Sequence, residues 1–140
     1  MINKNTGNIK LTDSLELTPK SNLNLLEGQN LGQANELRDI GNGCKWLDIK
    51  NINIGSKYFI ISLCFIDELL SELSLLVSDE RFSLSSHWSS WSERKEKEDL
   101  KKYTTWLNKE LGGKTEFHWG DVWATYDPKS GSSSIGIRYK

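Results

Sequence analysis

The chain has 140 residues, six of them Trp, and its 18 basic and 19 acidic side chains leave a formal net charge of −1. This length predicts a single domain over residues 1–140, large enough to bury a core without disulfides or a structural metal. The balanced charge provides no general attraction to nucleic acid or to an anionic membrane, so we expect neither as a partner.

The sequence also lacks the usual signs of export or membrane insertion. Cys44 and Cys64 are isolated, which indicates reduced thiols rather than a disulfide framework. The first residues contain no apolar segment typical of a signal peptide. Acidic residues interrupt the longest apolar run, 58–77, so it is not a membrane span. We therefore expect a soluble, cytoplasmic protein.

The pattern of the first 43 residues indicates little regular secondary structure. Apolar residues alternate with polar ones over 9–17, which indicates a strand formed around Ile9, Leu11, Leu15 and Leu17. Thr18 and Pro19 resemble the cap and first position of a short helical turn that buries Leu23 and Leu26 and ends at Gly28. Residues 28–43 are polar and rich in glycine, so they are expected to form a loop.

Residues 46–77 are typical of an antiparallel meander. A strand over 46–54, a turn at Gly55 and a strand over 58–65 follow from the alternation of apolar residues. The segment 67–77 allows two interpretations. It is a strand with Leu69, Ser71, Leu73, Leu75 and Val77 pointing inward, or a helix capped by Asp67. We favour the strand because a meander buries the preceding strand without a long connection.

A helix is predicted over 90–111. Ser90 and Glu93 have the spacing of a capping box, and Gly112 follows the last helical residue. The apolar stripe consists of Leu100, Tyr103, Leu107 and Leu111. Trp91 lies opposite this stripe, so packing of the stripe does not account for it.

The chain closes with a hairpin whose arms are 117–126 and 135–139, joined by the turn 127–131. The apolar phase changes at Gly120, which predicts a β-bulge at Gly120–Asp121 and places Trp123 on the outer face. Together these elements predict an α+β fold. It has a single antiparallel sheet of about five or six strands, with one main helix packed on one face.

Few residues have a pattern that indicates catalysis. His87 and His118 are the only histidines, and no spacing matches a zinc, calcium or phosphate site. We therefore expect no cofactor, no metal and no enzymatic activity. One alternative is an enzyme with a dispersed site at His118, Asp121 and Tyr126.

Exposed aromatic side chains offer another kind of site. Trp88, Trp91 and Trp123 are the candidate anchors for a partner, with His118 and Asp121 beside Trp123. Each Trp could instead belong to the core, or stack on a sugar in a carbohydrate- or small-ligand-binding module.

Two segments carry a resemblance to a known class of proteins. The pattern Trp119-Gly120-x-Val122-x-Ala124-x-Tyr126, its turn and Ile135-x-Ile137-x-Tyr139 resemble the C-terminal hairpin of small bacterial immunity proteins. Such proteins accompany polymorphic toxins or toxins of contact-dependent growth inhibition. The meander and the Trp106–Leu107 helix also resemble them, so the likeness spans about residues 46–140. It implies a non-enzymatic protein that neutralises a cognate toxin by direct binding.

Overall fold

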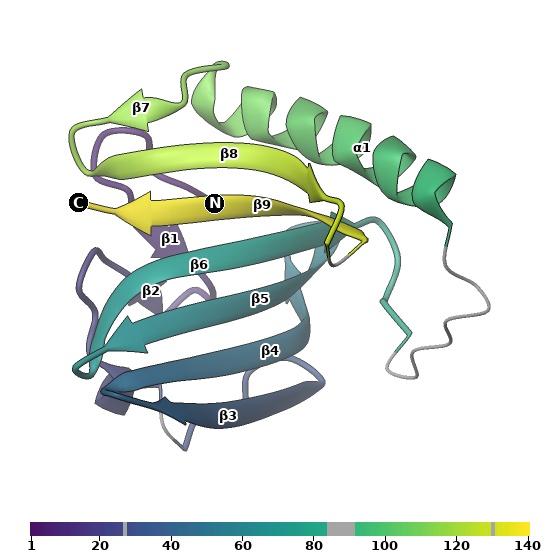
Figure 1. Cartoon of the computed structure of the whole chain (residues 1–140). Coiled ribbons are helices and arrows are strands. Elements are labelled where there is room, and N and C mark those ends of the chain that lie inside the picture. The colour runs from purple at the N-terminus through teal and green to yellow at the C-terminus, as the bar shows by residue number, and fades with distance from the viewer. Residues whose placement is uncertain (27, 84–91, 130) are drawn as a thin grey trace.

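The structure is a computed structural model that describes residues 1–26, 28–83, 92–129 and 131–140. Its main feature is a seven-stranded antiparallel sheet (Figure 1). The strands have the order β3-β4-β5-β6-β9-β8-β7. Their bounds are β3 (Ala34–Gly41), β4 (Cys44–Ile54), β5 (Lys57–Ile66), β6 (Leu69–Ser78), β7 (Glu116–Phe117), β8 (Gly120–Asp127) and β9 (Ser132–Tyr139).

Four further elements complete the described fold. A second, two-stranded sheet pairs β1 (Ile9–Lys10) with β2 (Glu16–Leu17). A short 3-10 helix, η1 (Leu23–Leu25), precedes β3, and the helix α1 (Glu93–Leu111) lies between β6 and β7 in sequence. None of the helices in the described parts of the chain is long and apolar enough to cross a membrane.

The sheet joins two parts of the chain that are far apart in sequence. Strands β3–β6 form the predicted meander, and β8–β9 form the predicted hairpin. They meet where β6 pairs with β9, for example Leu73 with Ile137. The α+β class and the strand at 67–77 are confirmed, and the helical alternative for that segment is wrong. A register irregularity makes Leu70, rather than Leu69 or Ser71, the buried residue at its start.

One face of the sheet is covered. Tyr103, Leu107 and Leu111 of α1 are buried against it, and the N-terminal segment contributes to the same core. Trp106 meets Phe59 of β5 edge-on, with 5.6 Å between the ring centroids. The N-terminal part of that core consists of Ile2, Ile9, Leu11, Leu15, Leu17, Leu23, Leu26 and Leu31.

The predictions for the first 43 residues need three corrections. The segment 9–17 is a hairpin rather than one strand, because the backbone turns between Leu11 and Leu15. The cap of η1 is Asn22 rather than Thr18. The predicted loop contains β3, which pairs with β4 along its length although nearly all its side chains are exposed.

The start of the helix also differs. Its N-cap is Ser92, whose side chain accepts a hydrogen bond from the Lys95 backbone N at 3.1 Å. Ser90, the predicted cap, lies outside the described residues. Gly112 ends the helix with φ 70°, as the sequence indicates.

The predicted bulge at Gly120–Asp121 is wrong. Phe117 of β7 pairs with Gly120 of β8, so His118 and Trp119 form a two-residue turn. The apolar phase changes at this position because the chain reverses direction. The extra strands β3 and β7 raise the sheet from the predicted five or six strands to seven.

Candidate functional site

The face of the sheet opposite the core, here called the open face, is the main candidate for a site. In β5, the buried residues Phe59, Ile61 and Leu63 alternate with the half-buried Ile60 and Ser62. The same alternation runs through the neighbouring strands, and α1, η1 and β1–β2 all place buried side chains in the core on the other side. The open face therefore presents side chains that no described helix buries.

Strand pairing arranges these side chains in rows across the sheet. One row contains one residue from each of the seven strands, and we call it the charged row. Its members, in spatial order, are Arg38, Trp46, Cys64, Glu72, Arg138, Asp121 and Glu116. The adjacent row, called the second row, contains Glu36, Asp48, Ser62, Ser74, Gly136 and Trp123.

At one end of the charged row, Arg38 is fixed by two kinds of contact. Its guanidinium carbon lies 5.9 Å from the Trp46 ring centroid. Its Nε and Nη2 donate to Asp48 Oδ2 and Oδ1 at 2.8 and 3.1 Å. The hydrogen bond to Asp48 raises the pKa of Arg38, against the opposing effect of desolvation. A bidentate contact of this kind holds an exposed Arg in one orientation.

Towards the other side of the sheet, Arg138 has similar contacts. Its guanidinium carbon is 5.8 Å from the Trp123 ring centroid, and its Nε lies 3.3 Å from Glu72 Oε2. The Trp123 indole packs on Gly136, where a Cβ atom would overlap it. Trp123 therefore contacts both a glycine and a guanidinium on the open face.

The open face is acidic. Its strand residues include six carboxylates and three cationic side chains, whereas the whole chain has a formal net charge of −1. The remainder of the chain is therefore formally +2. The carboxylates are Glu36, Asp48, Glu72, Glu116, Asp121 and Asp127, and the cations are Arg38, Lys50 and Arg138.

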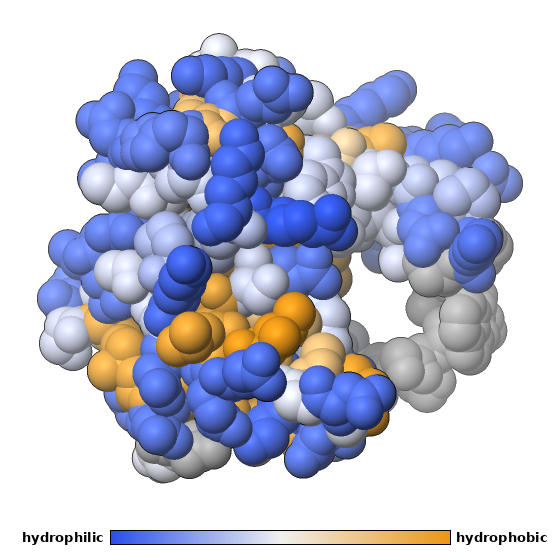
Figure 2. All heavy atoms as spheres, turned by 60° about the vertical axis from the view of Figure 1, so that its left-hand side comes forward, coloured by the Kyte–Doolittle hydropathy of each residue, from blue (hydrophilic) through white to orange (hydrophobic). Residues whose placement is uncertain are grey.

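An apolar patch borders the open face at one end of the sheet, where the β3–β4 and β5–β6 turns meet. Ile40, Ile66 and Leu69 are 60%, 48% and 40% exposed, and Leu25 of η1 is 47% exposed. Leu69 pairs with Ile66 in the sheet and bridges to Asn22, next to η1. We call these four residues the apolar tip; this end of the sheet comes forward in Figure 2, which shows orange surface amid blue.

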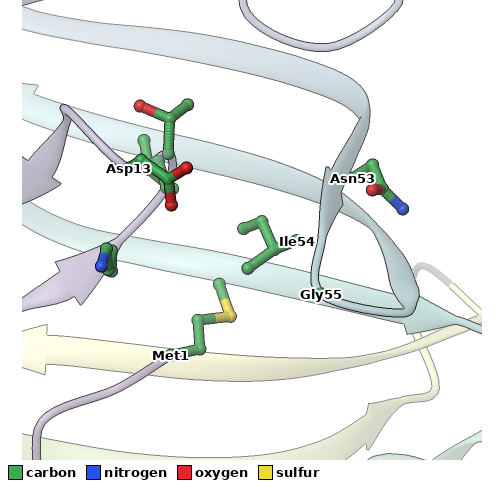
Figure 3. A pocket seen from close by; sticks show the side chains of 8 residues that line it. Met1, Asp13, Asn53, Ile54 and Gly55 are labelled. Atoms are coloured by element: carbon green, nitrogen blue, oxygen red, sulfur yellow. The ribbon is translucent and has the colours of Figure 1, made fainter.

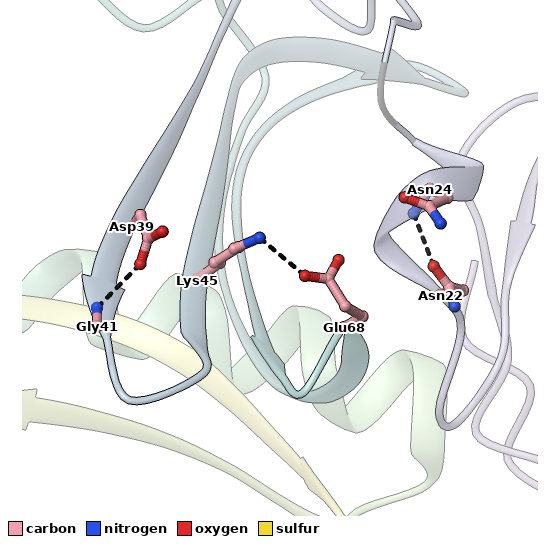
Figure 4. Close-up of polar contacts among 6 residues, drawn as sticks. All are labelled: Asn22, Asn24, Asp39, Gly41, Lys45 and Glu68. Atoms are coloured by element: carbon pink, nitrogen blue, oxygen red, sulfur yellow. Dashed lines mark hydrogen bonds and ion pairs between the residues drawn. The ribbon is translucent and has the colours of Figure 1, made fainter.

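Polar contacts hold the backbone around the apolar tip. Lys45 Nζ lies 2.8 Å from Glu68 Oε1, which ties β4 to the β5–β6 turn (Figure 4). The Gly41 backbone N donates to Asp39 Oδ1 at 2.9 Å, and the Asn24 N donates to Asn22 Oδ1 at 2.9 Å. These bonds hold the backbone of both turns and of η1, which carries the exposed apolar side chains.

Two hollows lie away from the open face. One, of about 410 Å³, is bordered by Met1, Asp13 and Ile54 (Figure 3). The other, of about 840 Å³, lies along α1 and contains Phe82, Trp106 and several lysines. No His or Cys is among the described residues that line either hollow. The described residues also include no group of three or more His, Cys, Asp or Glu that could hold a metal ion.

The structure brings two of the predicted partner-binding residues together. Asp121 and Trp123 both lie on the open face; Asp121 belongs to the charged row and Trp123 to the second row. His118 is exposed in the β7–β8 turn. Trp88 and Trp91 lie outside the described residues. Tyr126 faces α1, where Lys97 Nζ is 5.7 Å from its ring centroid, so His118, Asp121 and Tyr126 do not form one cluster.

Sequence reasoning missed Arg38, Trp46, Glu72 and Arg138. Each lies on the open face of its strand. For Trp46, the alternation of apolar residues in β4 and β5 indicates this face. Arg38 gave no comparable signal because β3 has no apolar alternation. The row itself depends on strand register, which composition and spacing do not contain.

No family model matches the chain, and no curated protein matches it. A solved structure does: a chain of the complex described as Rhs1-CT in complex with cognate immunity protein RhsI1. The two chains are 14% identical with a TM-score of 0.55, and the match covers 99% of this chain and 86% of that one. At this identity the match shows a shared fold. The resemblance inferred from the hairpin and the meander is confirmed at that level.

Proposed function

We propose that this chain is a non-enzymatic immunity protein that neutralises a cognate bacterial toxin domain in the cytoplasm by binding it directly. The observation that carries the proposal is the open face, where seven strands present ordered aromatic and charged side chains. The fold shared with a chain of a complex containing a cognate immunity protein supports the same function.

The geometry suits a binding surface. Trp and Arg are the residues that most often contribute large shares of binding energy at protein interfaces. Here Trp46 and Trp123 are each held against an arginine before any partner arrives. Because these side chains are already ordered, association loses less side-chain entropy than it would on a flexible surface.

Co-expression with a candidate toxin domain encoded beside this protein tests the proposal. We expect restored growth, together with co-elution of the two purified proteins in size-exclusion chromatography. An inactive toxin variant serves as the binding partner where the active toxin prevents expression.

Three outcomes would contradict the proposal in different ways. Absence of both protection and complex formation would remove the function as a whole. Protection without a complex would point to chemistry rather than occlusion. Growth arrest caused by this chain alone would assign it the toxic role.

A further inference from the structure

We infer that the open face is the surface that binds the toxin, and that the toxin meets it with a basic surface that also carries apolar side chains for the apolar tip. This inference rests on the proposed immunity function and adds to it the binding surface and the chemistry of the partner.

Acidic groups without an ion pair lie at both sides of the open face. Within the described residues, Arg38 pairs with Asp48 and Arg138 with Glu72, while Glu36, Glu116 and Asp121 have no ion pair. These unpaired carboxylates lie at both sides of the sheet rather than at one point. A partner with cations spaced across its surface could engage both sides.

Strand pairing also places like charges next to one another on the open face. Glu116 lies directly opposite Asp121, and neither has an ion pair within the described residues; Glu36 lies opposite Asp48, whose charge Arg38 offsets. Carboxylates at directly opposite positions of an antiparallel pair repel each other and destabilise the sheet. A basic partner would relieve this repulsion on binding, which gives the arrangement a reason to persist.

The open face also has the size of a protein interface, with apolar side chains at its border. Seven strands spaced by about 4.8 Å, with strands of about eight residues, give a face of roughly 29 by 27 Å. That corresponds to the approximately 800 Å² that each partner buries in a standard interface. The apolar tip lies at its border, where Ile40 and Ile66 are 60% and 48% exposed.

The charge also disfavours other occupants of the open face. A second copy of the chain would set one acidic face against another, and nucleic acid or an anionic membrane would be repelled by it. A basic protein surface is the occupant that the charge complements, and complementary charge accelerates association.

Charge-reversal variants test the inference by measuring association with the toxin domain at several salt concentrations. We expect Asp121→Lys combined with Glu116→Lys to slow association at least about tenfold at low salt. The effect should shrink as salt rises. Ile66→Ala should instead accelerate dissociation, because it removes an apolar contact that salt does not screen.

Matched controls separate the surface from overall charge and from folding. Asp13→Lys combined with Glu98→Lys makes the same change in net charge at exposed positions off the open face, and we expect near wild-type association. Thermal melting of each variant confirms that it is folded.

The inference fails if the control pair slows association as much as the open-face pair, or if neither pair has an effect. In those cases the complex still forms and the proposed function stands. A chain that dimerises through the open face in sedimentation experiments would also overturn the inference. Failure of the wild-type protein to bind the toxin would contradict the proposed function itself.

Discussion

The two faces of the seven-stranded sheet are formed by the same strands, yet they differ in almost every physical property. On the covered face, Ile61, Leu63 and Leu75 are at most 1% exposed and pack under the helix and the N-terminal segment. On the open face, most of the residues that alternate with them are half-buried or exposed, for example Ile60, Ser62 and Ser74. Buried apolar contacts are thus concentrated on one side, and the other side is the surface that we propose binds a partner.

The largest expected effect comes from equivalent substitutions on the two faces. Ile61→Ala should lower the free energy of unfolding by about 2–5 kcal/mol, because it leaves a cavity in the core. Ile60→Ala, at the adjacent position on the open face, should cost about 1 kcal/mol or less, since its side chain is only half-buried. Urea denaturation measures both. Equal losses would show that the open face also contributes a packed core.

A second prediction concerns the Trp123–Gly136 contact on the open face. Gly136→Ala should destabilise the protein by about 1–3 kcal/mol, because the new Cβ atom overlaps the indole. In a Trp123→Ala background the same substitution should be neutral or stabilising, since alanine suits a strand better than glycine. Additive effects in this double-mutant cycle would show that the two residues are independent.

The third prediction uses pH to probe Cys64, an outward residue that is nevertheless buried. Burial is the main cause that raises its pKa from 9.0 to about 12, followed by the contact with Cys44. The unfolded chain therefore loses this proton first, and stability should fall as pH rises above about 9, by roughly 1 kcal/mol per pH unit. Unfolding under reducing conditions at pH 8–10 measures the slope. The slope should be shallower in Cys64→Ala, and an unchanged slope would exclude Cys64 as its source.

The smallest expected effect is at the Arg38–Asp48 ion pair. Asp48→Asn should change stability by less than about 1 kcal/mol, because the pair is at the surface and the Arg38 side chain is 48% exposed. Chemical denaturation at low and high salt gives the measurement. A loss of several kcal/mol would mean that the charged row contributes to the stability of the fold.

The sequence predicted those parts of the fold whose signal is local. The alternation in 58–65, the stripe on the helix and the turn between β8 and β9 each follow from neighbouring residues. Strand β3 was missed because it is an edge strand with exposed side chains, held by backbone pairing that leaves no apolar pattern. The hairpin turn at His118–Trp119 was mistaken for a bulge because both shift the apolar phase.

The candidate site was accessible to sequence reasoning only in part. Asp121 and Trp123 were predicted on the outer face from alternation within one strand. Their neighbours Arg138 and Glu72 come from other strands, and the ion pair between them spans 66 residues of sequence. Such neighbours depend on register, which a single strand does not specify.

That separation has a kinetic consequence. Joining β6 to β9 requires closure of a long chain segment, a non-local step that costs entropy before its contacts form and that slows folding. Until β6 pairs with β9, the charged row is divided: the meander carries Arg38, Trp46 and Glu72, and the C-terminal hairpin carries Arg138 and Asp121. A nascent chain that has formed only the meander presents a fragment of the charged row, so the proposed binding surface is complete only when the global fold has formed.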